Sequence, residues 1–321
     1  MLTRGLNQMN PRLRVTAIVN PAAGGDGAKA VAALAAVGTA TLDTVETTAA
    51  GDATDLAFKL AVGENPPDVI TGVGGDGTIC EVVTGLHRAR EAGAAVPPLL
   101  VAPAGTGNST YRGLWDDAPW ETVAATALRG EAVVRHLDLA RVEQTGHVVV
   151  LGSGSGLFAE SLLARLGRPE TGRELLIAAS LAAMQSHVPY AGRVTVDGEV
   201  IYEGGIVETI AGGFPYRGGV LHLVPESIVD DGLLDITVIP ASVELMDFGQ
   251  AAVGRTLYQL PGVCWGRGER ITVERLDGQP VLYEHDGEVM PATGPAYDLT
   301  ALPAALAVLT PAEAPTWFGR R

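Results

Sequence analysis

The sequence has very little lysine and few positive charges. Lys29 and Lys59 are the only lysines, the 37 acidic residues outnumber 22 basic ones, and the net charge is −15. So acidic a chain lacks the basic footprint that nucleic acids require and the polybasic segment of a strong membrane anchor. The Walker pattern GxxxxGK[ST] is absent. Any nucleotide must therefore be bound without a phosphate-loop lysine.

Long apolar runs and cysteine pairs are also missing. No apolar stretch of about twenty residues occurs, which predicts no membrane-spanning helix, and residues 1–11 lack the apolar core of a signal peptide. Cys80 and Cys264 give neither a disulfide framework nor a metal-ligand spacing, which suits a reducing cytoplasm. With 47% hydrophobic residues in 321, the chain is long enough for two globular domains.

The central feature is a strand, a glycine turn and a helix start that meet between Asp68 and Leu86. Asp68 to Val73 is an apolar run typical of a buried strand, and Gly74-Gly-Asp-Gly-Thr78 follows it directly. Glycines let the backbone approach an anion, and a helix N-terminus offers unpaired N–H groups, so the turn predicts a phosphate site. Asp76 fits there when a divalent cation lies between it and the phosphate; the alternative is a cap on the following helix.

Two more strands end in glycine-bearing loops, at residues 20–27 and 103–109. Four strands that alternate with helices predict a parallel, doubly wound sheet, and ligands bind beyond the carboxyl ends of such strands. From about residue 133, short alternating runs predict an antiparallel β domain. We therefore expect an α/β domain over residues 1–135, a β-rich domain over 136–305, and a tail over 306–321 that packs back on the first domain.

Five short motifs occur in a fixed order along the chain. They are Asn20-Pro-Ala-Ala-Gly24, Gly74-Gly-Asp-Gly-Thr78 with Glu81, Pro103-Ala-Gly-Thr-Gly-Asn108, Asp230-Asp-Gly-Leu-Leu-Asp235 and Asp286-Gly-Glu288. Together they resemble the lipid kinases of the diacylglycerol kinase catalytic-domain type, which include sphingosine kinases and bacterial diacylglycerol kinases. The resemblance implies an N-terminal ATP domain and a C-terminal, β-sandwich-like domain that carries the lipid site. It also implies a phosphate cradle of backbone N–H groups, which would explain the missing lysine.

The resemblance also implies the residues that bind the nucleotide and Mg²⁺. The nucleotide set is Asn20, Pro21, Ala22, Ala23, Gly24, Thr47, Gly74, Gly75, Asp76, Gly77, Thr78, Glu81 and Thr106. The residues alone favour a plain strand-end role for Thr47, and only the resemblance places it beside the nucleotide. Asp76 is the residue expected to organise catalytic Mg²⁺. Asp231, with the backbone carbonyls of Ile228 and Leu233, resembles the ligand set of a structural Mg²⁺; the alternative is a turn that closes onto the next strand.

Glu288 is the predicted general base. A lipid hydroxyl has a very high pKa, so a positioned carboxylate must take its proton as the bond to phosphorus forms. The alternative is an ordinary hairpin turn, because Asp-Gly is a common hairpin signal. The same tripeptide recurs at Asp197-Gly-Glu199, where we expect such a turn. The motif order alone distinguishes Glu288.

Four positions depart from the family's pattern. Cys80 and Gly152 stand where asparagine is common, Ser109 stands where many members have aspartate, and the loop at Gly212-Gly213 lacks a common asparagine. All four lie near the loops that would shape the site. The prediction of phosphoryl transfer does not depend on these four positions. Any prediction of which lipid is phosphorylated is weaker because of them.

The sequence thus predicts a cytoplasmic, ATP- and Mg²⁺-dependent kinase for a hydroxyl of a diacylglycerol-like or sphingoid-like lipid, with peripheral membrane association. It predicts no nucleic-acid partner and leaves a homodimer open. Two alternatives are an NAD kinase or other small-molecule kinase with the same glycine loop, and a non-catalytic lipid- or nucleotide-binding protein. Two leucine- and arginine-bearing helical segments, 157–166 and 173–186, are either an interfacial flap or a buried helix pair.

Overall fold

The first half of the chain folds around a parallel sheet. The computed structural model describes residues 12–23, 26–170, 172–217 and 221–319. The strands are β1 (Leu13–Val19), β2 (Ala40–Glu46), β3 (Val69–Gly74) and β4 (Leu99–Pro103). They lie in the order β2-β1-β3-β4 and pair in parallel. The strand order reverses between β1 and β3, which is where α/β sheets of this type bind ligands.

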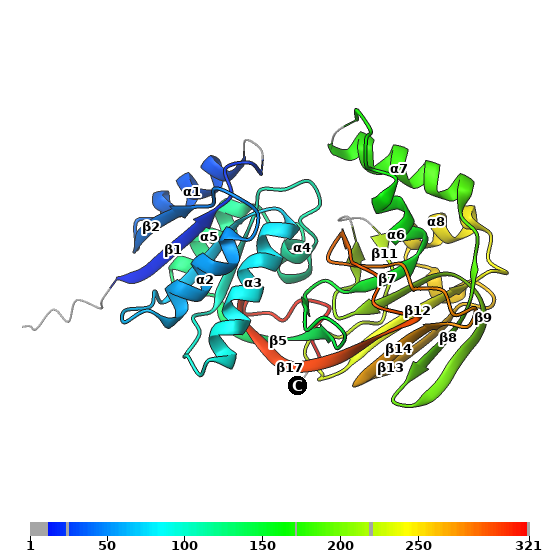
Figure 1. Cartoon of the computed structure of the whole chain (residues 1–321). Helices are drawn as coiled ribbons and strands as arrows, with labels where there is room; N and C mark the ends of the chain where they lie inside the picture. The colour runs from blue at the N-terminus through cyan, green and yellow to red at the C-terminus, as the bar shows by residue number, and fades with distance from the viewer. Residues whose placement is uncertain (1–11, 24–25, 171, 218–220, 320–321) are drawn as a thin grey trace, which may run out of the picture.

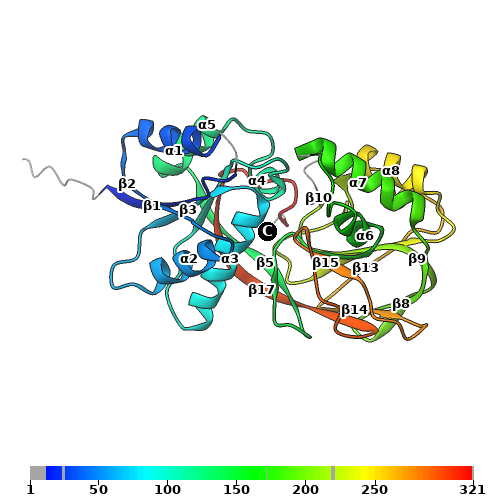
Figure 2. The ribbon, with the colours of Figure 1, turned by 45° about the horizontal axis from the view of Figure 1, so that its top comes forward.

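Helices cover both faces of this sheet. They are α1 (Asp26–Val37), α2 (Asp52–Val62), α3 (Asp76–Glu91), α4 (Ser109–Trp115) and α5 (Trp120–Leu128). α1 and α5 pack together on one face, and α2 and α3 pack together on the other (Figure 2). β3 is buried along its whole length because both of its faces are covered. The predicted doubly wound α/β domain is confirmed.

The second half of the chain consists mainly of antiparallel strands. Its elements are β5 (Val133–Val142), β6 (Val148–Val149), β7 (Ser153–Gly156), α6 (Leu157–Leu163), α7 (Gly172–Ser186), β8 (Tyr190–Val196), β9 (Glu199–Gly212), β10 (Tyr216–Arg217), β11 (Leu221–His222), β12 (Leu234–Pro240), α8 (Leu245–Gly254), η1 (Leu257–Gln259), β13 (Cys264–Gly268), β14 (Arg270–Arg275), β15 (Tyr283–His285), β16 (Glu288–Val289) and β17 (Ala296–Thr310). β14, β8, β9, β12 and β13 pair antiparallel in that order. The predicted antiparallel character of this domain is confirmed. α6, α7 and α8 lie together over one side of the strands (Figure 1).

Two long strands belong to both domains. β17 pairs antiparallel with β5 over most of its length and, near its end, in parallel with β4. Leu299 lies in the core of the second domain, whereas Leu306 and Leu309, farther along the same strand, lie in the core of the first. Trp317 and Phe318 also pack in that first core. The boundaries expected at residues 135 and 305 therefore fall inside β5 and β17.

The two helical segments with leucine and arginine form a packed pair that also presents apolar side chains outward. α6 and α7 contact each other, and Ala179 and Ala183 of α7 are buried. Leu166, Ile177 and Leu181 are nevertheless 78%, 55% and 54% exposed. No helix in the described part of the chain is both long and apolar enough to cross a membrane.

Candidate active site

Three loops meet at the carboxyl ends of β1, β3 and β4, where they form a groove of about 880 Å³. The backbone N–H of Asn20 donates to the carbonyl oxygen of Val73, and that of Ala104 donates to Gly74, both at 3.0 Å. The groove is lined by Asn20, Pro21, Ala22, Ala23, Thr47, Thr48, Ala49, Ala50, Gly75, Gly77, Thr78, Glu81, Gly105, Thr106 and Gly172. Of the residues predicted to bind the nucleotide, all that the structure describes line this groove except Gly74 and Asp76. Gly24 lies outside the described residues.

The second and third loops touch backbone to backbone, at Gly75 and Gly105. A Cβ on Gly75 would lie 3.3 Å from the Cα of Gly105, and a Cβ on Gly105 would lie well inside van der Waals contact of Gly75. Asn108, in a left-handed conformation with φ of 51°, closes the third loop, because its side chain both accepts from the N–H of Gly105 and donates to its carbonyl oxygen, each at 2.9 Å. Only residues without a side chain allow this approach.

The first loop is tied to the start of α3 by a side-chain hydrogen bond. The Nδ2 of Asn20 donates to the Oγ1 of Thr78 at 2.9 Å, while the Oδ1 of Asn20 accepts from the N–H of Ala22, also at 2.9 Å. The motif residues Asn20 and Thr78 therefore shape the groove as well as line it. Both were expected as nucleotide contacts, and the bond between them was not.

Glu81 lines the groove and also holds the start of α2. Its carboxylate accepts from the N–H groups of Gly51 at 2.9 Å and Ala53 at 3.2 Å. The loop between β2 and α2 contributes Thr48, Ala49 and Ala50 to the lining, and the sequence reasoning missed these three. The rule that ligands bind beyond the strand ends applies to β2 as well and would have indicated this loop.

Asp76 joins two helix starts. It is the first residue of α3, whose cap residue Gly75 makes no side-chain capping bond. Its carboxylate instead accepts from the N–H groups of Ser109 at 2.9 Å and Thr110 at 3.1 Å, at the start of α4. Asp76 therefore caps α4 and not its own helix. This negative charge lies against the partial positive charges of two helix N-termini.

Glu288 lies on a hairpin held firmly by its neighbours. β15 and β16 pair through His285 and Glu288, and Asp286 and Gly287 turn between them with φ of 54° and 88°, as in a type I′ turn. Glu288 itself is exposed. The motif therefore does form an Asp-Gly hairpin, as the alternative interpretation expected. The side chain of Asp286 is nevertheless only 6% exposed, so it is not a solvated turn residue.

Asp286 fastens this hairpin to the segment before β7. Its carboxylate accepts from the N–H groups of Val150, Leu151 and Gly152 at 2.6 to 3.3 Å. Burial opposes the charge, but the hydrogen bond and charge of His285, together with these N–H groups, lower the pKa of Asp286. It is therefore an ionised structural residue that fixes the direction of the β15–β16 turn.

Charged side chains of both domains affect Cys80 of α3. Burial raises the pKa of the Cys80 thiol well above its usual value, and the charges of Asp286, Asp76 and Glu288 raise it further. Cys80 thus lies among carboxylates of both domains. The charges of Asp76, in the first domain, and of Glu288, on the β15–β16 hairpin, therefore both act on this one thiol.

The loop before β12 carries the residues predicted for a structural metal. Asp231 accepts the N–H of Leu233 at 3.1 Å through Oδ1, and its Oδ2 lies 3.5 Å from Nη1 of Arg267. Nε of Arg267 also donates to Oδ1 of Asp235 at 2.8 Å, and burial raises the pKa of Asp235 to about 6. Among the described residues, no three His, Cys, Asp or Glu side chains cluster as a metal site.

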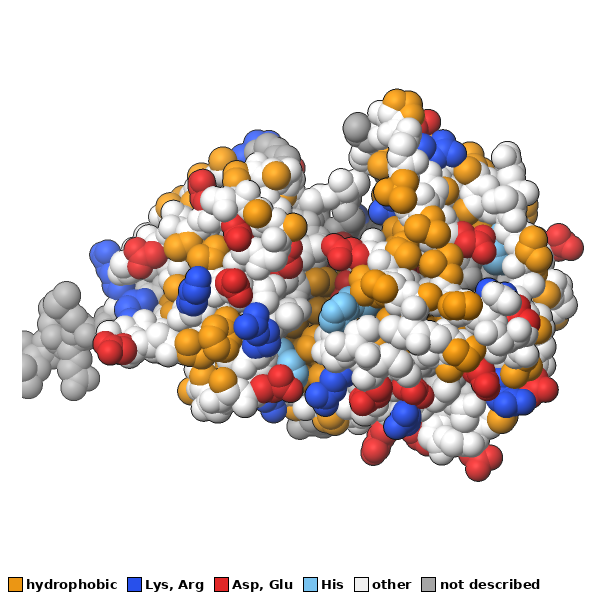
Figure 3. Space-filling model, viewed as in Figure 1, with side chains coloured by type: hydrophobic (Ala, Val, Ile, Leu, Met, Phe, Trp, Pro, Cys, Tyr) orange, Lys and Arg blue, Asp and Glu red, His pale blue; other side chains and the backbone are white. Residues whose placement is uncertain are grey.

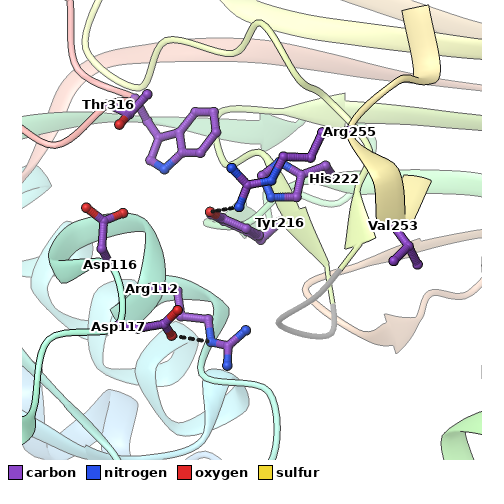
Figure 4. A pocket seen from close by; sticks show the side chains of 9 residues that line it. Arg112, Asp116, Asp117, Tyr216, His222, Val253, Arg255 and Thr316 are labelled. Atoms are coloured by element: carbon purple, nitrogen blue, oxygen red, sulfur yellow. Dashed lines mark hydrogen bonds and ion pairs between the residues drawn. The ribbon is translucent and has the colours of Figure 1, made fainter. Parts of the chain in front are cut away.

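A second, smaller cavity of about 320 Å³ lies between the domains (Figure 4). It is lined by Arg112, Asp116, Asp117, Tyr216, His222, Val253, Arg255, Thr316 and Trp317. Arg255 reaches the hydroxyl of Tyr216 at 3.4 Å, and Arg112 pairs with Asp117 at 3.4 Å. This charged lining is unsuited to an acyl chain.

Two family models together cover most of the chain. The "Diacylglycerol kinase catalytic domain" matches residues 14–142, and the "YegS C-terminal NAD kinase beta sandwich-like domain" matches residues 164–310. The "Probable lipid kinase YegS-like" protein of Stenotrophomonas maltophilia (strain K279a) is 30% identical over 232 residues, which are 67% of this chain and 73% of that protein. The chain belongs to the YegS-like lipid kinases.

Further comparisons fit this family. The diacylglycerol kinase of Bacillus subtilis (strain 168) is 31% identical over 206 residues, 60% of this lipid kinase and 61% of its relative. A crystal structure from Bacillus anthracis, of a protein named as a candidate diacylglycerol kinase, superposes with a TM-score of 0.72 at 24% identity and covers 94% of this chain and 97% of the other. This last likeness concerns the fold alone. As a member of the lipid kinase family, the chain is a phosphotransferase, as the sequence predicted.

Proposed function

We propose that this lipid kinase transfers the γ-phosphate of ATP to a hydroxyl group of a diacylglycerol-like or sphingoid-like lipid. The observation that carries the proposal is the groove at the carboxyl ends of the parallel strands, where glycine backbones meet at Gly75 and Gly105. Family membership supplies the kinase chemistry, and the groove has the backbone donors and the size for a nucleotide.

The phosphates would be held by backbone N–H groups at the start of α3 and by its helix dipole. Of the two lysines, Lys29 is exposed on α1 and pairs with Asp26 at 2.9 Å, and Lys59 lies in the last turn of α2. Neither is among the described residues that line the groove. In the proposal, backbone groups would therefore do the work that a phosphate-loop lysine does elsewhere.

Asp76 would hold Mg²⁺ or its water shell beside the phosphates. Its carboxylate is an oxygen donor of the kind that Mg²⁺ prefers, and its oxygens keep lone pairs beyond those used by Ser109 and Thr110. When bound, Mg²⁺ neutralises charge on the phosphates. The contribution of the chain is to hold Asp76 still, between the starts of α3 and α4.

Glu288 would act as the general base. As the lipid oxygen bonds to the γ-phosphorus and the bond from phosphorus to ADP breaks, the hydroxyl proton passes to the Glu288 carboxylate and then to water. The fixed turn at Asp286 holds Glu288 in one direction. Because Glu288 is exposed, a lipid headgroup could reach it.

The exposed apolar side chains around α6 and α7 would bring the lipid kinase to its substrate. Leu163, Leu166, Ile177, Leu181 and Val188 are all at least two-fifths exposed, and Figure 3 shows apolar side chains gathered over these helices. Because the chain carries a net charge of −15, we propose that it docks on a cytoplasmic membrane surface through apolar insertion and not through charge.

The test is transfer of labelled phosphate from ATP and Mg²⁺ to a panel of lipids in vesicles, with NAD as a soluble acceptor in a parallel arm. We expect label in a diacylglycerol or a sphingoid base and none in NAD. Label in NAD alone would favour the small-molecule kinase alternative. Nucleotide binding without transfer to any acceptor would favour a binding protein.

A further inference from the structure

The loop that resembles a structural Mg²⁺ site already holds a positive charge. Arg267, on β13, inserts its guanidinium between this loop and β12. Its Nε donates to Asp235 at 2.8 Å, its Nη1 lies 3.5 Å from Asp231, and its Nη2 donates to the backbone carbonyl oxygen of Glu226 at 2.6 Å. Two carboxylates and a carbonyl are the oxygen ligands that a hard cation would take.

The position of Arg267 is set by the sheet. In the antiparallel pairing of β12 with β13, Arg267 is directly opposite Asp235, so the two side chains are cross-strand neighbours. The planar guanidinium offers several donors in a fixed arrangement and stays charged at any physiological pH. The charge opposite Asp235 is therefore a permanent part of the fold.

Burial explains why a cation is needed here. The side chain of Asp235 is 0% exposed, and those of Arg267 and Asp231 are 29% and 26% exposed. A buried carboxylate without a partner strongly destabilises a fold. A divalent ion at the same oxygens would lie beside the guanidinium and be repelled by it.

The same loop forms a junction, because it contacts β5, which contacts β17 through Asp138, and also contacts the segment after β17. Gly232 donates its N–H to Asp138 of β5, and Asp138 also accepts from Ala304 of β17. Asp230 accepts from Gly319, and the N–H of Val229 donates to Trp317. The charge that fixes this loop thus also fixes the place where β5, β17 and the segment after β17 come together.

We propose that Arg267 takes the place of the divalent cation in this loop, so that the junction is held without metal. Its side chain closes a latent cation site made of Asp231, Asp235 and neighbouring carbonyl oxygens. Removal of the guanidinium would open that site. The proposal concerns stability and does not rest on the proposed kinase reaction.

The experiment compares thermal unfolding of the full chain without nucleotide, after EDTA treatment, with and without MgCl₂ or CaCl₂ at matched ionic strength. The wild-type melting temperature should not respond to either ion. Elemental analysis before EDTA should find no bound ion that is lost in Asp231→Asn. Arg267→Ala should melt roughly 5–10 °C lower. Mg²⁺ or Ca²⁺ should then recover a few degrees of that loss.

Three variants separate a latent site from general destabilisation. Arg267→Lys keeps a charge and should gain no metal response, and Arg267→Ala combined with Asp231→Asn should lose the response. Arg270→Ala removes an exposed arginine that pairs with Asp298 at 3.2 Å, and it should show neither the large loss nor the response. If Arg267→Ala does not fold, measurements on the wild-type protein still test the proposal. A fall in its melting temperature with EDTA, or one bound ion per chain that Asp231→Asn removes, would overturn the proposal.

Discussion

Carboxylates that accept backbone N–H groups recur through the site. Asp76 fixes the start of α4, Glu81 fixes the start of α2, and Asp286 fixes the segment before β7. Hydrogen bonds of this charge-assisted kind are short and strong. Glu288 is different, because it is exposed on a hairpin that its neighbour Asp286 holds. A general base needs a carboxylate that is held in place and open to the substrate, which is why we propose this role for Glu288.

Glu288→Gln should strongly reduce phosphate transfer while ATP still binds, because the amide cannot take the proton of the lipid hydroxyl. Loss of a general base costs about 10²–10⁴-fold in rate. Lipid phosphorylation and ATP binding by calorimetry measure the two effects separately. The matched control is Glu199→Gln, in the second Asp-Gly-Glu tripeptide at the β8–β9 turn, which should keep wild-type turnover. Wild-type turnover in Glu288→Gln would remove this residue from the mechanism.

Asp76→Asn should lower both turnover and stability, since the residue has two tasks. The lost charge weakens the hold on Mg²⁺, so we expect turnover to fall by orders of magnitude. The amide also pairs poorly with two N–H donors, which should cost about 1 kcal/mol of the free energy of unfolding. Turnover and the melting temperature are both measured. A drop in melting temperature with normal turnover at saturating Mg²⁺ would leave Asp76 as a cap only.

At the scale of elements, the groove depends on how closely two loops approach. α3 and α4 begin beside each other because Gly75 and Gly105 touch, and Asp76 then reaches across to α4. The turn residues therefore set the spacing of two helix N-termini. A small displacement there would widen the proposed phosphate cradle and move Asp76 away from it.

Gly105→Ala should destabilise the first domain, because its methyl group would overlap the Cα of Gly75. Overpacking of this kind costs about 1–3 kcal/mol, and urea unfolding measures it. Gly77→Ala is the control, since a Cβ there meets no atom within 4 Å, and it should keep or slightly raise stability at its helical position. Equal stability of the two variants would show that the loops separate freely.

The sequence predicted the elements well where a short-range pattern determines them. The strand–glycine–helix unit at β3, the alternation of strands and helices, and the hairpin at Asp197-Gly198 all follow from local signals. The bonds of Asp76 to α4 and of Asp286 to residues 150–152 were not predictable, because they join segments 33 to 136 positions apart. The partnership of Arg267 with Asp235 depends on strand register, which no local pattern reveals.

At the scale of the whole molecule, the apolar stripe of α6 and α7 would set how the lipid kinase faces a bilayer. Ile177 and Leu181 are one helical turn apart on α7, so they share a face. Leu166, in the turn before α7, extends the apolar area. The helices therefore carry both a packed inner side and an exposed apolar outer side.

Leu181→Glu should weaken binding to vesicles and slow phosphorylation of long-chain lipid in them, because a charge in the apolar interface opposes insertion. Vesicle co-sedimentation and turnover on vesicles are the measurements. Turnover on a short-chain lipid dispersed in detergent should be unchanged. Val200→Glu, at another exposed apolar position, is the control and should bind as wild type. Equal vesicle binding by Leu181→Glu would place the docking surface elsewhere.

Because β17 belongs to both domains, the sheet of the first domain can be completed only late in synthesis. β4 has β3 on one side and β17 on the other, and β17 (Ala296–Thr310) is made long after β4. Until then, one side of the nucleotide-domain sheet stays open, and strand edges left open in this way favour misassociation. Ribosome-bound chains halted before residue 296 should therefore engage chaperones and resist folding, although every groove-lining residue has already been made.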